Sequence, residues 1–597
     1  MILPILTCQK SHLRTLRALA RVFLTKFKYN VNIPILMKIN KEKAEIILIV
    51  ALYIFAIYMW SMPFQENRMP YGETDSGTHF TISDYMTVTD KAMYMLPAQF
   101  SHTYNKNNAG RIWYPPQFHL DVSIAQIVGR DRVISAFLFY AIICSSLVLS
   151  SYLLFRKLFG ILIGFLSAFF LVFSTRDILW YVFGQYPQVA SFAYIPIILY
   201  SYYKYVDSFF SDKKKPIYLY ITAILLSIQF FFHPQGIVAS GLIMALFSLF
   251  VIIKERKFFF DMSEIAPSHS PSFSSEKEGR FLSMLKNTLR PLGRGVFDIR
   301  HALVFLLIII ILIAPFFSIL LGKEGKFLRD LSAGSGGTST AGFFYWTKTP
   351  KEPGVGYSGY YSYRTMNGLW TLPFVLLAIS LLLIKRERKE LLLLSWLIAL
   401  FILFHESIIG GRAERFMEIE SYLLWPLVII GLLAIPQFFK LPSSIKKYIK
   451  YSLVVLFLVL VISLNSKIPY EFLKEKAYPG LNRLTPAQYR VAEWLMKNTD
   501  EENTEFYITG QLTYTKQKWM WALSHRSMTW SVASPVFNPT LLNECEPKCT
   551  HALVDYSDLV ALNAQNEIKQ LQGWEQTNLI NASLIYNKYD IKVYKLG

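Results

Sequence analysis

The chain has few charged residues for its length. Of its 597 residues only 17% are Asp, Glu, Lys or Arg, against about 25% in a typical soluble domain. No Walker loop, zinc-ligand series or dinucleotide fingerprint is present. No sequence motif therefore supports nucleotide binding or zinc binding. There are only four cysteines. Two of them, Cys545 and Cys549, are close enough in sequence to form a disulfide if that part of the chain lies outside the cell.

Ionisable residues are also absent from the middle of the long apolar segments. We predict eleven membrane helices, because each of these segments approaches the length needed to cross about 30 Å of hydrocarbon. They are Ala44–Met62, Arg132–Phe155, Leu158–Ser174, Gln188–Tyr203, Ile217–Phe232, Gly236–Ile253, Ala302–Leu321, Gly368–Ile384, Leu391–Phe404, Tyr422–Phe439 and Tyr451–Leu464. Ion-coupled transporters usually need an intramembrane ionisable group, so the absence disfavours that class.

The basic residues that are present lie in alternate connections between these segments. The net charge is +20, and Lys and Arg gather at Arg156-Lys157, Lys213–Lys215, Lys254–Lys257, Lys385–Lys389 and Lys446-Lys447. Membrane proteins keep such loops in the cytoplasm. The pattern therefore predicts a multi-pass protein of the cell membrane, with its N-terminus in the cytoplasm and everything after Asn465 outside. It argues for membrane orientation and against a nucleic-acid partner.

This topology predicts three regions. Residues 1–43 form a basic cytoplasmic segment, in which we expect Met37 to be the natural start. Residues 44–465 form the membrane domain, with a long outer loop at 63–131, a cytoplasmic loop at 254–300 and an outer loop at 322–367. Residues 466–597 form an extracytoplasmic domain.

The composition of this last region is that of a small mixed α/β domain. Thr485-Pro-Ala-Gln488 is a capping-box helix start. Glu505–Thr509 and Ala552–Tyr556 are predicted strands, and Ser583–Tyr586 with Ile591–Leu596 is a predicted hairpin. The fold class predicted for the chain is a polytopic α-helical membrane protein with a C-terminal α/β domain.

The first outer loop contains the leading candidate for chemistry, Glu73-Thr-Asp75-Ser-Gly-Thr-His79. If the backbone is helical, Asp75 and His79 lie four residues apart on one face. That arrangement makes Glu73, Asp75 and His79 candidate acid, base or metal-binding residues. The alternative is a solvated loop in which Asp75 caps a short helix.

Three more polar groups lie at predicted outer ends of membrane helices. They are Arg176-Asp177 with Gly184-Gln-Tyr-Pro187, His233-Pro-Gln235, and Gly410-Gly-Arg412-Ala-Glu-Arg415. Guanidinium groups bind phosphate through two parallel hydrogen bonds, so Arg412 and Arg415 are predicted to bind phosphate. The alternatives are a capping or packed role for His233 and a pair between Arg415 and Glu418 on the same helix.

In order along the chain, these features resemble the GT-C superfamily of integral-membrane glycosyltransferases. The resemblance covers most of the chain in layout and rests on Glu73-Thr-Asp75, Tyr114-Pro-Pro-Gln-Phe-His119, Gly184-Gln-Tyr-Pro187 and Ala492-Glu-Trp-Leu-Met-Lys-Asn498. It implies transfer of a sugar from a polyprenyl-phosphate donor to a glycan, lipid or protein acceptor at the outer membrane face.

The resemblance also implies roles for single residues. Asp75 would deprotonate or orient the acceptor, or help Asp177 to hold a divalent metal such as Mg²⁺ or Mn²⁺. Arg412 and Arg415 would neutralise the departing phosphate, and His119, Gln185, Tyr186 and His233 would contact the substrate.

The chain also departs from the family pattern. Arg176 precedes a single Asp177 where oligosaccharyltransferases have two acidic residues, and their Trp-Trp-Asp signature is absent. Both departures weaken the expectation of a metal and of peptide-sequon transfer. A flippase for lipid-linked glycans and a non-catalytic scaffold for cell-surface assembly are the alternative functions.

Overall fold

The structure is a computed structural model. It describes residues 41–66, 68–72, 74–89, 116–210, 214–255, 299–321, 362–405, 413–466, 470, 473, 483–500, 504–510, 514–529 and 549–597. The chain divides into two compact units, Met1–Leu52 and Tyr53–Gly597. The described part of the first unit is the beginning of helix α2, Lys41–Trp60.

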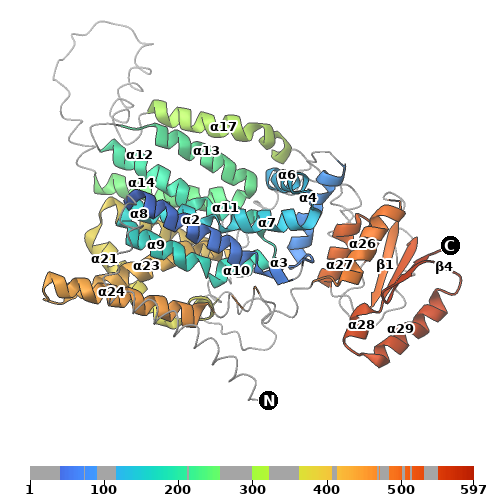
Figure 1. The fold of residues 1–597 in the computed structure, drawn as a ribbon. Helices are drawn as coiled ribbons and strands as arrows, with labels where there is room; N and C mark the ends of the chain where they lie inside the picture. Colours follow the sequence, from blue (N-terminus) through green and yellow to red (C-terminus); the bar gives the residue numbers. More distant parts are fainter. Residues whose placement is uncertain are drawn as a thin grey trace, which may run out of the picture. The chain divides into compact units, whose positions relative to one another are not determined.

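Helices make up most of the second unit (Figure 1). After α2 they are α3 (Met62–Glu66), α4 (Thr74–Thr89), α6 (Gln117–Gly129), α7 (Arg132–Ser145), α8 (Leu147–Phe159), α9 (Ile161–Val172), α10 (Thr175–Val182), α11 (Tyr186–Ala193), α12 (Ile195–Phe209), α13 (Ile217–Phe232), α14 (Pro234–Lys254), α17 (Ile299–Leu321), α20 (Tyr363–Asn367), α21 (Leu372–Lys385), α22 (Arg388–His405), α23 (Glu420–Ala434) and α24 (Ser443–Leu460). Short 3₁₀ turns lie at Leu369–Thr371, Ala413–Ile419 and Ile435–Phe438, and a π turn at Val461–Asn465 ends α24.

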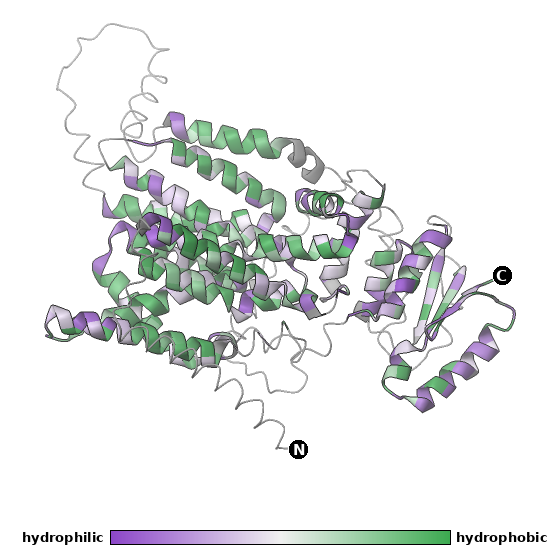
Figure 2. Cartoon of the chain, viewed as in Figure 1, coloured by the Kyte–Doolittle hydropathy of each residue, from purple (hydrophilic) through white to green (hydrophobic). Residues whose placement is uncertain are grey.

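Helix covers most of each of the eleven apolar segments predicted from the sequence, although breaks such as the one at Gly160 interrupt several of them. Six stretches of helix in the described residues are long and apolar enough to cross a membrane: Glu42–Trp60, Arg132–Phe159, Ile161–Val182, Pro234–Lys254, Arg415–Phe438 and Ser443–Leu464. Three shorter apolar helices, Ile217–Phe232, Arg300–Ala314 and Leu369–Lys385, accompany them. Figure 2 shows the apolar residues concentrated on these helices. The predicted multi-pass helical fold is confirmed.

Local sequence explains where several of these helices begin and end. The Asp131 carboxylate accepts hydrogen bonds from the backbone N–H groups of Val133 and Ile134, which caps α7. Between α8 and α9, Gly160 has a φ of 90°, a conformation open mainly to glycine. The chain therefore turns sharply at a point that hydropathy alone leaves ambiguous.

The C-terminal part of the chain contains a five-stranded mixed sheet. Its strands are β1 (Glu505–Gly510), β2 (Ser527–Thr529), β3 (His551–Asp555), β4 (Ser583–Lys588) and β5 (Ile591–Lys595), in the order β2-β1-β3-β5-β4. The first three are parallel to one another, and β4 and β5 form the predicted antiparallel hairpin. Helices α26 (Pro486–Asn498), α27 (Tyr514–Ser524), α28 (Ser557–Ala561) and α29 (Gln565–Asn578) accompany the sheet.

One sequence expectation for this region is confirmed, and a second only in part. The capping box that begins α26 is formed by Thr485 and Gln488, and Cys549 is in a disulfide. Cys545, the partner suggested by its spacing, lies outside the described residues. Sequence patterns gave no indication of α27.

The predicted outer loop at 63–131 contains more ordered structure than its polar sequence indicates. Within it lie α3, α4 and α6. Helix α4 is largely inaccessible, since Ser76, His79, Phe80 and Asp84 are all buried. The alternative of a solvated loop around Asp75 is therefore wrong. The predicted loops at 254–300 and 322–367 lie almost entirely outside the described residues.

Candidate active site

The site begins where the first turn of α4 meets the connection between α10 and α11. Gly184 makes this approach possible: it has a φ of 82°, and a Cβ atom there would lie 2.1 Å from the backbone nitrogen of Ser76. Only a residue without a side chain fits such a contact. The two residues that follow Gly184 are thereby placed against α4. Gln185 donates a side-chain hydrogen bond to Asp75 Oδ2, and the Tyr186 hydroxyl donates one to Ser76 Oγ at 3.2 Å.

Asp75 and His79 lie on the same helix, as the sequence predicts, but the direct partner of His79 is another histidine. Its Nδ1 lies 3.0 Å from Nε2 of His119 on α6, and both rings are buried. One nitrogen must donate and the other accept, so at least one ring is unprotonated. Burial holds the pKa of each ring well below its usual value, and His233, Lys518 and Arg415 lower that of His79 further. The two histidines therefore form a neutral pair.

Arg415 and His233 converge on this pair from separate parts of the chain. Burial, with the nearby charge of Arg415, lowers the pKa of His233 to about 3. Arg415 also acts on His79. His233 caps α14 as well, because its Nδ1 accepts a hydrogen bond from the backbone N–H of Gln235 at 3.3 Å. His233 therefore caps α14 and also lies near Arg415.

Asp177 has different direct partners. Its Oδ2 accepts a hydrogen bond from Ser421 Oγ at 2.6 Å, and the preceding Arg176 pairs with Glu420 at 2.9 Å. Glu418 links this group to the rest of the site. It accepts a hydrogen bond from Gln188 at 2.9 Å, and its charge interacts with those of both Asp177 and Arg415. The alternative pairing of Arg415 with Glu418 therefore has support, alongside its position near the histidines.

A lysine that the sequence did not single out lies near Asp75, close enough for the two charges to interact. Lys518 lies on α27 and is fully buried. A Cβ atom on Gly77 of α4 would lie 3.4 Å from its Cγ, which is ordinary contact. Burial lowers the pKa of Lys518 to about 8, against the opposing influence of the negative charge of Asp75. The next residue, Trp519, anchors α27 by packing against Phe80 and Phe137 with ring centroids 5.6 and 5.9 Å away.

The described residues do not assemble the predicted metal site. Asp75 and Asp177 have different hydrogen-bond partners, and the described ranges contain no group of three His, Cys, Asp or Glu side chains placed to hold an ion. Glu73 and Arg412, predicted to act in catalysis and phosphate binding, lie outside the described residues.

Comparison with solved structures identifies the architecture. An oligosaccharyltransferase, AglB from the archaeon Archaeoglobus fulgidus, in complex with an inhibitory peptide and a dolichol-phosphate, aligns over 93% of this chain and 74% of its own, with a TM-score of 0.52 and 15% identity. ArnT from Cupriavidus metallidurans aligns over 93% of this chain and 98% of its own, with a TM-score of 0.50 and 11% identity. The fold is GT-C-like.

Sequence comparison is less informative than the GT-C-like fold. A family model described as a family of unknown function, DUF6541, matches residues 39–263. No curated protein has a significant match to the chain. The likeness to AglB and ArnT concerns the fold, so a function must be argued from the residues of the site.

Proposed function

We propose that this protein is a membrane glycosyltransferase that transfers a sugar from a polyprenyl-phosphate donor to an acceptor at the outer membrane face. The observation that carries the proposal is the placement of the Asp75 carboxylate. It is partly exposed and oriented by Gln185. It interacts electrostatically with a buried lysine, in a region that also contains Arg415 and two neutral histidines.

This arrangement suits a displacement at the anomeric carbon of a glycosyl phosphate. Asp75 accepts the proton of an acceptor hydroxyl while that oxygen forms a bond to the anomeric carbon. The bond from this carbon to the phosphate oxygen breaks, and its electron pair leaves with the phosphate. Arg415 stabilises the charge of the departing group.

The histidines have a supporting role in this scheme. Since His79 and His119 are hydrogen-bonded to one another in their neutral forms, they add no positive charge that would repel Arg415 or compete with it for the phosphate. Gln185 fixes one carboxylate oxygen of Asp75 and leaves the other for the acceptor. No step of this scheme is assigned to a metal.

The direct test is sugar transfer from radiolabelled polyprenyl-phosphate donors by the purified full-length protein in liposomes. Asp75→Asn keeps the shape of the side chain and removes its charge, so transfer should fall by about 10²–10⁴-fold, the usual contribution of a general base. Asp121→Asn is the matched control, because Asp121 lies on α6 and bonds only to Gln117 among the described contacts.

The outcome separates the candidate functions. Near-normal transfer by the Asp75 variant would remove Asp75 from catalysis. If no donor is used by the unmodified protein, while a labelled glycolipid crosses the liposome bilayer, the protein is a flippase and not a transferase.

A further inference from the structure

Helix α27 has a charged contact on each of two sides. Toward α28, Lys516 pairs with Asp558 at 2.6 Å. Toward α4, Lys518 packs on Gly77, and its charge interacts with that of Asp75, two residues away. Residues two apart on a helix point in nearly opposite directions, so the two lysines serve different neighbours.

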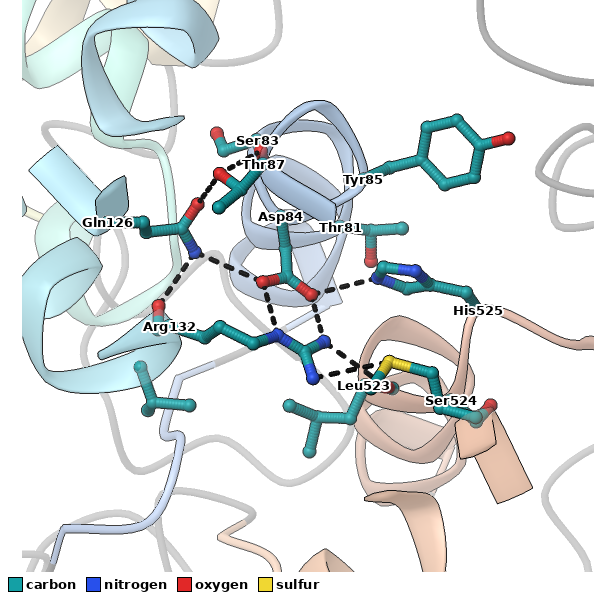
Figure 3. A network of polar contacts seen from close by, with 12 residues as sticks. Thr81, Ser83, Asp84, Tyr85, Thr87, Gln126, Arg132, Leu523, Ser524 and His525 are labelled. Atoms are coloured by element: carbon teal, nitrogen blue, oxygen red, sulfur yellow. Dashed lines mark hydrogen bonds and ion pairs between the residues drawn. The ribbon is translucent and has the colours of Figure 1, made fainter. Parts of the chain in front are cut away.

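A second contact joins α27 to α4 further along both helices. Asp84 is completely buried on α4 (Figure 3). Arg132, at the start of α7, donates to both of its carboxylate oxygens, through Nε to Oδ1 at 2.7 Å and through Nη2 to Oδ2. His525, immediately after α27, donates from Nε2 to Oδ2 at 2.8 Å. Gln126 of α6 adds a longer bond of 3.3 Å. We call Asp84, Arg132 and His525 the clasp.

The spacing along the two helices fits a side-by-side arrangement. Asp75 and Asp84 are nine residues apart, or about 13 Å along α4 at a rise of 1.5 Å per residue. Lys518 and His525 are seven residues apart, or about 10 Å. The helices therefore run in the same direction, with Asp75 and Lys518 at one end of the contact and the clasp at the other.

We infer that α27 completes the candidate active site: Lys518 positions the Asp75 carboxylate, and the clasp holds α27 where Lys518 can do so. The inference rests on the proposed function. Lys518 is buried, so it acts through Asp75 and does not itself touch the substrate. The attraction of the Lys518 ammonium and the hydrogen bond from the Gln185 amide together restrict the directions available to the carboxylate.

The first experiment separates positioning from binding. Lys518→Met removes the charge and nearly keeps the volume, so kcat for sugar transfer should fall by about 10- to 100-fold, the scale for losing one preorganised electrostatic group or misplacing a reacting one. The KM for the donor should change little. Lys518→Arg should recover most of the rate. Lys516→Met, two residues earlier on the same helix, should transfer sugar normally.

The second experiment asks whether the clasp works through Lys518. His525→Phe should lower kcat in the wild-type background and have little further effect in the Lys518→Met background. His525→Gln, which retains a donor N–H, should be milder than His525→Phe. Effects of Lys518 and His525 that multiply independently, or a rise in KM without a fall in kcat, would overturn the inference.

A readout without activity keeps this result distinct from failure of the proposed function. In a Gly77→Cys, Lys518→Cys double variant the two sulfurs should come within disulfide range, because a Cβ atom on Gly77 would lie close to the Lys518 side chain. Oxidation of the full-length protein should crosslink the pair efficiently, and adding His525→Phe should reduce the yield several-fold. If crosslinking is as described but no donor is used, the proposed function fails and the positioning by the clasp stands. If His525→Phe leaves the yield unchanged, the clasp does not hold α27.

Discussion

Removal of Arg132 from the clasp should destabilise the protein strongly. Arg132 supplies two of the hydrogen bonds that Asp84 accepts, and charge-assisted bonds contribute about 1.5–3 kcal/mol each. Arg132→Met would leave a carboxylate with no exposed surface facing only His525 and Gln126. Breaking a buried ion pair from one side usually costs about 3–5 kcal/mol, and we expect a loss in that range at pH 7.

The pH dependence of this loss of stability tests the role of Arg132 more specifically than its magnitude at pH 7. Burial raises the pKa of Asp84, but Arg132 and His525 outweigh it, so the folded-state pKa lies below its usual value. The stability contributed by Asp84 is therefore present above the unfolded pKa of about 3.9 and lost as pH falls through the folded one. Without Arg132, burial dominates and the folded pKa rises. The variant should then regain stability relative to the wild type as the pH is lowered from 7 toward 5.

Thermal unfolding in detergent across this pH range measures both effects. Arg130→Met is the matched control, since Arg130 is exposed and lies two residues earlier, at the end of α6. Equal melting temperatures for the two variants at pH 7, or a penalty for Arg132→Met that grows on acidification, would refute the account of the clasp.

Three further predictions concern the remaining parts of the molecule. Replacing Arg415 with Ala should weaken binding of a polyprenyl phosphate by about 1.5–3 kcal/mol, with poor rescue by Lys, which lacks the planar fork; unchanged binding in a liposome titration would leave only its pairing role. Because the folded-state pKa values of His79 and His119 are depressed, unfolding draws protons below about pH 6.5, so thermal stability should drop as pH falls from 7 to 5. Phe at both positions should flatten that slope, and an undiminished slope would contradict the neutral pair. For topology, a membrane-impermeant thiol reagent on intact cells should label a Cys placed at Asp500 and miss one placed at Ser274; the opposite labelling would reverse the predicted orientation.

Hydropathy was sufficient to predict most of the helical fold. Each predicted apolar segment is mostly helical, because chain length and apolar composition alone determine what can cross a membrane. The C-terminal hairpin and the start of α26 were equally predictable, since the turn and the capping box are local features. Helix α27 was not, because its sequence mixes lysines with tryptophans and its burial depends on contacts with α4 more than 400 residues away in sequence.

The sequence predicted some residues of the candidate site and missed others. Asp75 and His79 were selected because they are four residues apart, and His233 and Arg415 because the ionisable residues gather at the predicted outer ends of the apolar segments. Their proximity could not be deduced from spacing, because it depends on how α4, α14 and the turn at Ala413–Ile419 pack. Lys518 was missed because nothing local distinguishes it from Lys516; only the fold shows that one lies near Asp75 and the other near Asp558.

The distance in sequence between the two sides of the clasp has a consequence for biosynthesis. Asp84 and His525 are separated by 441 residues, which a ribosome adds in roughly 20–90 s at about 5–20 residues per second. Throughout that interval the membrane helices can insert, although Lys518, the residue inferred to position Asp75, has not yet been synthesised. Under the proposed function, a nascent chain that already holds most of the lipid-facing surface should therefore have a reduced kcat until translation has passed α27. A product truncated before this point would occupy the membrane with Asp75 incompletely positioned.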